Sequence, residues 1–112
     1  MPYTINGQPT ELSEDPHVQN GAVYVPITPV IQALGGTISW DNDTKVATAT
    51  IGQWVATFQL TSDTADVSGT TVQFSSPSYV DQGVLYVPAD FFHNAYGYVV
   101  TANGDDVSIS LP

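Results

Sequence analysis

Short stretches of the chain alternate between polar and apolar residues, and a period of two is typical of β-strands with one buried face. Residues 37–40 (Thr-Ile-Ser-Trp) alternate in this way, and residues 46–51 (Val-Ala-Thr-Ala-Thr-Ile) follow after the turn-forming residues 41–44. These stretches therefore predict a β-hairpin. Residues 54–60 predict a further strand. Residues 23–25 (Val-Tyr-Val) predict a short one, which ends at the following proline because proline has no N–H to donate.

Two short helices are predicted from apolar residues that would share one helical face. Thr28 and Asp90 stand just before these helices and suit N-cap positions, where their side-chain oxygens would accept amide hydrogens of the first turn. Pro29 suits the first helical position, at which its missing N–H has no consequence. Gly35 and Gly97 are placed to end the helices in the left-handed conformation. The apolar faces comprise Val30, Ile31 and Leu34 in the first helix and Phe91, Phe92, Ala95 and Tyr96 in the second.

The chain contains an internal repeat with an offset of 62 residues. Tyr-Val-Pro occurs at residues 24–26 and again at 86–88, and one ungapped register extends around both triplets. We therefore predict an α+β domain over residues 1–112, built from two pseudo-symmetric β–helix–β-hairpin repeats at about residues 3–52 and 53–112. Its sheet would be mostly antiparallel, with two short helices. The predicted core comprises Tyr24, Val25, Ile31, Leu34, Ile38, Trp40, Tyr86, Val87, Phe92, Tyr96 and Val100.

Composition narrows the range of partners. The 112 residues include 11 acidic side chains and a single basic one, Lys45, which gives a formal net charge of −10 at pH 7. Because phosphate contacts need a basic patch, this balance excludes nucleic acid and disfavours an anionic membrane surface. No apolar stretch approaches the roughly 20 residues of a membrane span. The absence of cysteine excludes disulfides and thiolate metal sites.

The same composition bears on location. Thr, Ser, Gly, Asn, Gln and Val take the place of the Lys and Glu residues that usually cover a cytosolic protein. This favours an extracellular or cell-envelope location. The chain has no signal peptide at its first residues, which leaves a cytoplasmic location open.

Histidine and aspartate residues leave metal binding open as an alternative. His17 and His93 are the two histidines of the chain, and with Asp15 or Asp90 they could supply ligands for copper or zinc. The spacing of these residues does not favour such a site over ordinary loop and helix positions.

Two acidic turns suggest a second kind of metal site. Asp41 and Asp43 lie in one turn, and Asp105 and Asp106 lie in the corresponding turn of the second repeat. Calcium takes oxygen ligands at this kind of spacing. The alternative is a pair of plain hairpin turns, because tight turns select Asp, Asn and Gly for their tolerance of positive φ.

An ordered set of motifs resembles the repeat of the copper amine oxidase N-terminal-like domain family. Tyr-Val-Pro at residues 24–26 is followed by Ala-Leu-Gly-Gly at 33–36 and Ser-Trp-Asp at 39–41, and the second copy has Ala102 where the first has tryptophan. The resemblance implies an appended, stalk-like domain that holds neither the copper nor the quinone cofactor. It also implies a module of bacterial cell-surface proteins. The chain lacks the arginines that often flank Tyr-Val-Pro in this family.

These observations predict a non-catalytic structural or interaction module of a bacterial cell-envelope or secreted protein, with no cofactor. Its partner would be a protein or a cell-wall polymer. The sequence is also compatible with a homo-oligomer. One alternative is a small metal-binding protein (copper, zinc or calcium) or an enzyme accessory domain. Another is a carbohydrate-binding module, in which Trp40, Trp54 and tyrosine side chains would form a stacking platform rather than part of the core.

Overall fold

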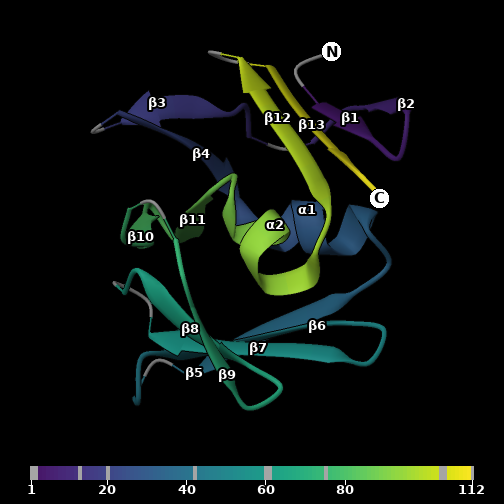
Figure 1. Cartoon of the computed structure of the whole chain (residues 1–112). Helices are drawn as coiled ribbons and strands as arrows, with labels where there is room; N and C mark the ends of the chain where they lie inside the picture. Colours follow the sequence, from purple (N-terminus) through teal and green to yellow (C-terminus); the bar gives the residue numbers. More distant parts are fainter. Residues whose placement is uncertain are drawn as a thin grey trace.

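Three β-sheets surround two short helices (Figure 1). This computed structural model describes residues 3–12, 14–19, 21–41, 43–59, 62–74, 76–103 and 106–111. Over these residues the fold is α+β and mostly antiparallel, as predicted. The first elements are β1 (Tyr3–Ile5), β2 (Gln8–Thr10), β3 (His17–Gln19), β4 (Ala22–Pro26), α1 (Ile27–Ala33), β5 (Thr37–Asp41), β6 (Val46–Ile51) and β7 (Trp54–Gln59). They are followed by β8 (Thr64–Val67), β9 (Thr70–Gln73), β10 (Tyr79–Asp81), β11 (Val84–Pro88), α2 (Phe91–Tyr96), β12 (Val99–Asn103) and β13 (Asp106–Ser110).

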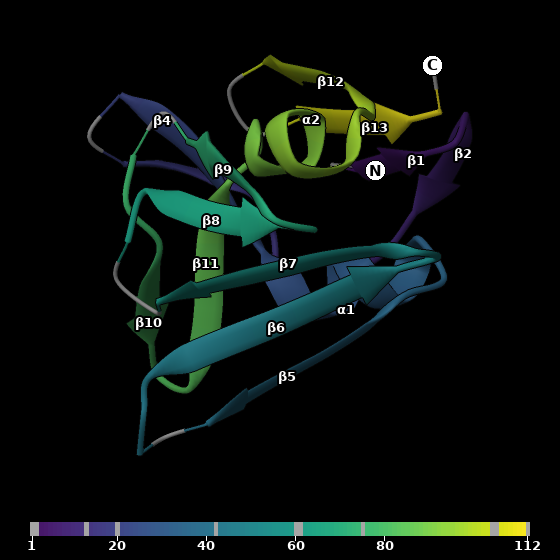
Figure 2. The same cartoon turned by 60° about the horizontal axis from the view of Figure 1, so that its bottom comes forward.

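Each sheet combines strands from distant parts of the chain. The strand orders are β12-β13-β1-β2, β10-β11-β4-β3 and β5-β6-β7-β8-β9. In the first sheet β1 runs parallel to β13, with Ile5 opposite Ile109, so both ends of the described chain lie in one sheet. In the second sheet β4 and β11 are antiparallel, with Val25 opposite Val87. The third sheet crosses in front of α1 in the turned view of Figure 2.

The start of α1 and the capping at both helix N-termini differ from the sequence prediction. Helix α1 begins at Ile27, one residue before Thr28, and Pro26 occupies the N-cap position without a side-chain hydrogen bond. Ile27 is fully buried, so packing extends the helix back to the end of β4. Pro29 is tolerated in the first turn because amides there have no partner within the helix. Asp90 does precede α2, but its backbone is helical and its side chain makes no cap hydrogen bond.

The ends of the helices agree with the prediction. Gly97 caps α2 with φ of 80°, and Gly35 follows α1 with φ of 85°, a conformation that favours glycine. Gly36 has a different role, because a Cβ atom added there would lie 2.3 Å from the carbonyl oxygen of Thr50 on β6. Its missing side chain lets the chain leaving α1 approach β6. Neither helix in the described part of the chain is long and apolar enough to cross a membrane.

The core lies between the helices and the inner faces of the sheets. Five predicted core residues are buried, namely Tyr24, Val25, Ile31, Val87 and Phe92. Five others are only partly buried against the core, namely Leu34, Ile38, Trp40, Tyr96 and Val100. Tyr86 is also partly exposed. The core prediction missed fully buried residues of the third sheet (Ala47, Ala49 and Ala56) and of the first sheet (Ile109). Phe91, predicted on the apolar face of the second helix, is fully buried. Ala47 and Ala49 lie on β6, a strand that α1 contacts.

Candidate functional site

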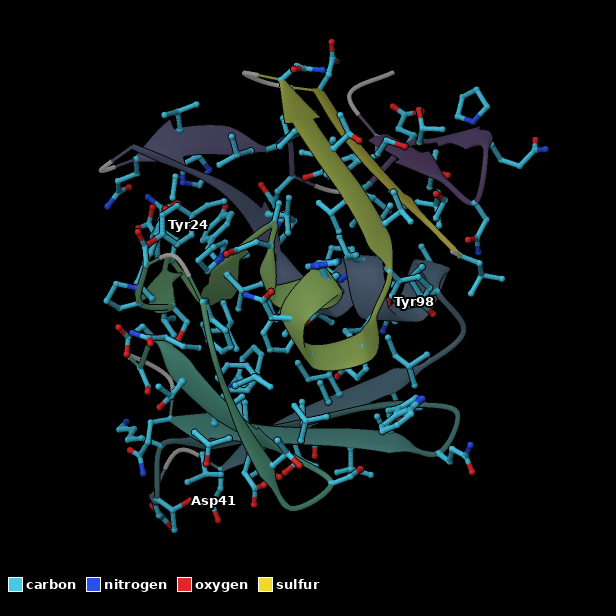
Figure 3. All side chains as sticks on the ribbon, viewed as in Figure 1. Tyr24, Asp41 and Tyr98 are labelled. Carbon is cyan, nitrogen blue, oxygen red and sulfur yellow. The ribbon has the colours of Figure 1, made fainter. Side chains whose placement is uncertain are left out.

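Four aromatic side chains form a cluster on one face of the β10-β11-β4-β3 sheet. His17 lies opposite Tyr24 in the β3–β4 pair, and Tyr79 lies opposite Tyr86 in the β10–β11 pair. Ring centroids are 4.8 Å apart for His17 and Tyr86, 4.9 Å for Tyr24 and Tyr79, and 5.3 Å for Tyr79 and Tyr86. Tyr24, one of these residues, is labelled in Figure 3. We call these four residues the aromatic cluster.

Hydrogen bonds tie the aromatic cluster to the neighbouring loops. The His17 imidazole Nε2 is hydrogen-bonded to the Tyr79 hydroxyl, which joins β3 to β10. The Tyr24 hydroxyl donates to the carbonyl oxygen of Pro77 at 2.7 Å, and the Tyr3 hydroxyl donates to that of Glu14 at 2.8 Å. The bond from Tyr24 holds the loop that precedes β10, and the bond from Tyr3, a residue outside the aromatic cluster, holds the loop that precedes β3. The hydroxyl groups therefore have a structural use in the fold.

Burial also raises the pKa of two tyrosines of the aromatic cluster. Burial, together with the nearby Tyr86, Tyr24 and Asp81, raises the pKa of Tyr79 from 10.0 to about 12. Burial likewise raises the pKa of the Tyr86 hydroxyl. Both groups stay protonated at neutral pH, which makes them hydrogen-bonding groups and unsuited to act as phenolate nucleophiles or bases.

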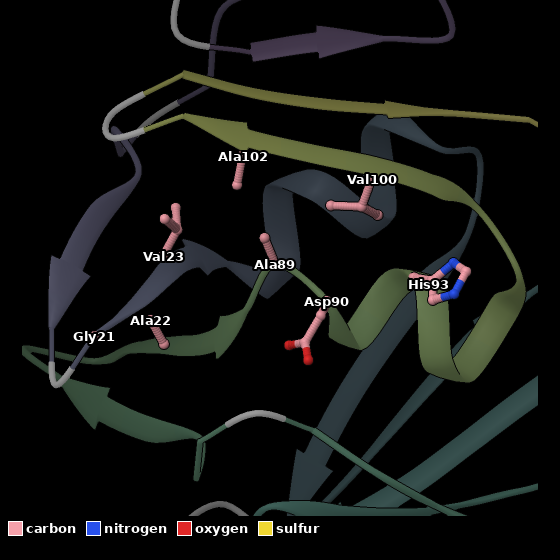
Figure 4. A pocket seen from close by; sticks show the side chains of 8 residues that line it. All are labelled: Gly21, Ala22, Val23, Ala89, Asp90, His93, Val100 and Ala102. Atoms are coloured by element: carbon pink, nitrogen blue, oxygen red, sulfur yellow. The ribbon is translucent and has the colours of Figure 1, made fainter.

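A hollow of about 340 Å³ lies between β12, α2 and the start of β4. Val100 and Ala102 point from β12 toward Val23 and Ala89 across the hollow (Figure 4). The walls are mostly small apolar side chains, and α2 and the residue before it add one carboxylate and one imidazole. The lining residues are Gly21, Ala22, Val23, Ala89, Asp90, His93, Val100 and Ala102.

His93 contributes to the end of α2. Its Nδ1 lies 2.9 Å from the carbonyl oxygen of Tyr98. Because a carbonyl oxygen can only accept, Nδ1 carries the proton and donates it to this bond. The bond links α2 to the residue just before β12. The prediction for His93 as a helix residue is confirmed, since α2 spans it.

The structure describes the first acidic turn more fully than the second. The Asp41 Oδ1 atom accepts hydrogen bonds from the amides of Asp43 at 2.8 Å and Thr44 at 3.4 Å, as in an ordinary tight turn. Asp41 is labelled in Figure 3, at the tip of the third sheet. Asp106 begins β13 and is exposed, whereas Asp105 lies outside the described residues. Calcium binding at these turns stays a prediction.

The two histidines lie in separate surroundings. His17 contacts tyrosine rings of the aromatic cluster, and His93 is bonded to the Tyr98 carbonyl. Within the residues that the structure describes, no three His, Asp or Glu side chains form a group that could hold a metal ion. The set of His17 and His93 with Asp15 or Asp90 is therefore not brought together as one group there.

Sequence reasoning missed both the aromatic cluster and the hollow. One signal was present for the cluster, because His17 and Tyr79 are separated by 62 residues and so are Tyr24 and Tyr86. The repeat offset alone would have paired these positions. It could not show that strands β4 and β11 pair with each other, which is the contact that brings all four rings together.

Comparison with known proteins gives one informative result. A search of curated protein sequences finds no match to this chain. A family model described as the copper amine oxidase N-terminal domain matches residues 4–111, which is nearly the whole chain. The matched region includes the aromatic cluster and all residues that line the hollow. The chain therefore belongs to the copper amine oxidase N-terminal domain family.

Proposed function

We propose that the chain is a structural and interaction module of the stalk type, in a bacterial protein that is secreted or held in the cell envelope. The observation that carries this proposal is the family match over residues 4–111. An accessory domain of this kind supports and positions other parts of a protein, or contacts a partner. Its partner would be a protein or a cell-wall polymer.

The use of polar side chains supports a structural role. His17 binds the Tyr79 hydroxyl, His93 donates to a backbone carbonyl, and Asp41 accepts amides of its own turn. Each of these groups stabilises a strand, a helix end or a turn. Three of the candidate residues from the sequence thus have structural uses within the fold.

The outer face of the third sheet supports an envelope or extracellular location. One row crosses all five strands of this sheet, with Ser39, Thr48, Thr57, Asp66 and Thr71 opposite one another in turn. Four of these five residues carry hydroxyl groups, where a cytosolic protein would more often carry Lys and Glu. The net charge of −10 also keeps such a surface soluble.

We also infer that the chain is one domain of two pseudo-symmetric repeats, at about residues 3–52 and 53–112. Strands β3 and β10, β4 and β11, and β5 and β12 begin and end 62 residues apart. Between β4 and β11, Tyr24 lies opposite Pro88 and Tyr86 lies opposite Pro26. A local two-fold axis at the Val25–Val87 pair would produce this register. One hydrophobic core draws residues from both repeats.

Carbohydrate binding is a second candidate function, favoured by the aromatic cluster. Tyr79 and Tyr86 are stacked with an interplanar angle of 26°, and both are partly exposed. Stacked, partly exposed rings can pack against a sugar face. Trp54 is another exposed aromatic side chain, with 49% of its surface accessible, whereas Trp40 packs against the core.

Cell fractionation and a binding assay test these functions. An antibody against the native protein should find it in the culture medium or the envelope fraction, and recovery from the cytosol would overturn the location. Purified cell walls should be incubated with the wild-type chain and with Tyr86→Ala. Loss of binding in the variant supports the carbohydrate candidate, and equal binding contradicts it. One tightly bound copper or zinc ion per chain, measured after dialysis, would instead favour the metal-binding alternative.

A further inference from the structure

The hollow exists because its walls carry short side chains. We compare each lining residue with its counterpart, the residue 62 positions away in the other repeat. The apolar lining residues are Ala22, Val23, Ala89, Val100 and Ala102, and their counterparts in that order are Val84, Leu85, Ile27, Ile38 and Trp40. Every counterpart is larger. The hollow therefore reflects five reductions in side-chain size at one place, whereas protein interiors are normally close-packed.

The largest of these differences in side-chain size is at Ala102, whose counterpart is Trp40. Trp40 on β5 lies opposite Ala47 and packs against the hydrophobic core. Ala102 has the same position along β12, opposite Val107, and it is exposed. The change from tryptophan to alanine removes a whole indole ring from this wall. The space left is therefore suited in size to a large aromatic group.

The hollow lies beside a strand edge that no other strand pairs with in the described part of the chain. The order β12-β13-β1-β2 places β12 at the edge of its sheet. Its five residues, Val-Val-Thr-Ala-Asn, carry no charge, and four of them are exposed. An edge strand of this kind presents unpaired amides and carbonyls that can pair with an added strand. Alternate side chains of the added strand would lie on the face of the sheet that carries Val100 and Ala102.

The negative charge of the chain favours a basic partner at the edge of β12. Asp90 places a carboxylate in the lining of the hollow, and the chain as a whole has a net charge of −10. A second copy of the chain would bring the same negative charge and be repelled. A basic partner would be attracted, and the attraction would also steer its approach.

We propose that the hollow receives a large aromatic side chain, carried by an extended basic segment of a partner protein that pairs with the free edge of β12. This inference rests on the proposed interaction role and names the class of partner. The backbone pairing with β12 supplies general affinity. The hollow supplies specificity through one side chain, as pockets do in other domains that bind by strand addition.

The first test uses a synthetic peptide, acetyl-Lys-Val-Trp-Val-Lys-amide, titrated into the ¹⁵N-labelled chain. We expect saturable amide shifts at Val23, Ala89 and Ala102. The same peptide with alanine in place of tryptophan should bind roughly 30-fold more weakly, as for loss of a buried aromatic anchor. Replacement of both lysines by glutamate should also weaken binding. Shifts confined to other parts of the chain, or equal binding of the alanine peptide, would overturn the proposal.

The second test fills the hollow from within. Ala102→Trp should place an indole at the position that corresponds to Trp40 in the other repeat. It should weaken the binding of the tryptophan peptide by the same roughly 30-fold. Thr101→Trp is the matched control, because it adds the same side chain to the opposite face of β12, and it should retain binding. If Ala102→Trp does not fold, Ala89→Ile tests the same wall, since isoleucine is its counterpart. Retained binding in the folded filling variant contradicts the proposal. An envelope location with no peptide binding would overturn this inference alone.

Discussion

Substitution of Gly36 by alanine should destabilise the fold strongly. A Cβ atom at this position would lie 2.3 Å from the Thr50 carbonyl oxygen, 2.8 Å from Cγ1 of Ile51 and 3.1 Å from Cγ2 of Ile31. The nearest atom belongs to the backbone of β6, a strand paired on both sides with β5 and β7. Relief of the clash requires the chain after α1 to move away from this strand by roughly 1 Å.

The magnitude follows from what must move. Overpacking in a close-packed region typically costs about 1–3 kcal/mol, and a backbone neighbour places this substitution at the upper end, at about 3 kcal/mol. Movement of the chain would also strain the hydrogen bond of 2.8 Å from the Gly36 amide to the Ile31 carbonyl oxygen. The free energy of unfolding of a small domain is only about 5–15 kcal/mol, so this loss is a large share of the total. The melting temperature should fall by roughly 10–20 °C.

Gly35→Ala is the matched control for this experiment. A Cβ atom at Gly35 would meet nothing within 4 Å, so its cost comes from the left-handed backbone alone, with φ of 85°. That cost is about 1 kcal/mol. Urea denaturation of the wild-type chain and both variants, followed by circular dichroism, gives the free energies of unfolding. A Gly36→Ala loss below about 0.5 kcal/mol, or one smaller than that of Gly35→Ala, would refute the close approach as the reason for glycine.

Two further predictions concern charge and pH. Alkaline pH should destabilise the fold because the pKa of Tyr79 is raised from 10.0 to about 12: its stabilising contribution is complete below pH 10 and is lost as the pH rises toward 12. Urea denaturation at pH 8 and pH 11 should therefore show a smaller loss for Tyr79→Phe than for the wild type, and equal losses would contradict this. Added sodium chloride should raise the melting temperature, because 11 acidic groups face one lysine and their repulsion is screened beyond about 8 Å at 0.15 M salt. A midpoint that falls with sodium chloride would contradict the repulsion argument, and a rise specific to calcium at matched ionic strength would indicate a cation site at Asp41 and Asp43.

The sequence by itself determined the local elements. Residues 46–51 alternate and form β6 with the predicted bounds, and the partner strand predicted at residues 37–40 differs from β5 by one residue. The conformations of Gly35 and Gly97 were also predictable, because the left-handed region is set by the residue itself. Alternation, turn residues and glycine all act through neighbours a few positions away, so a single sequence records them.

Only the tertiary structure decided which strands pair when they are distant in the sequence. Nothing local places β1 beside β13, where Tyr3 lies opposite Val107. The β4–β11 pairing likewise creates the aromatic cluster, although none of its four residues is adjacent in sequence to another. The start of α1 moved to Ile27 because burial of that side chain outweighed the capping preference of Thr28. Contacts of this kind depend on the whole packed arrangement, and the hollow forms only where β12, α2 and the start of β4 are brought together.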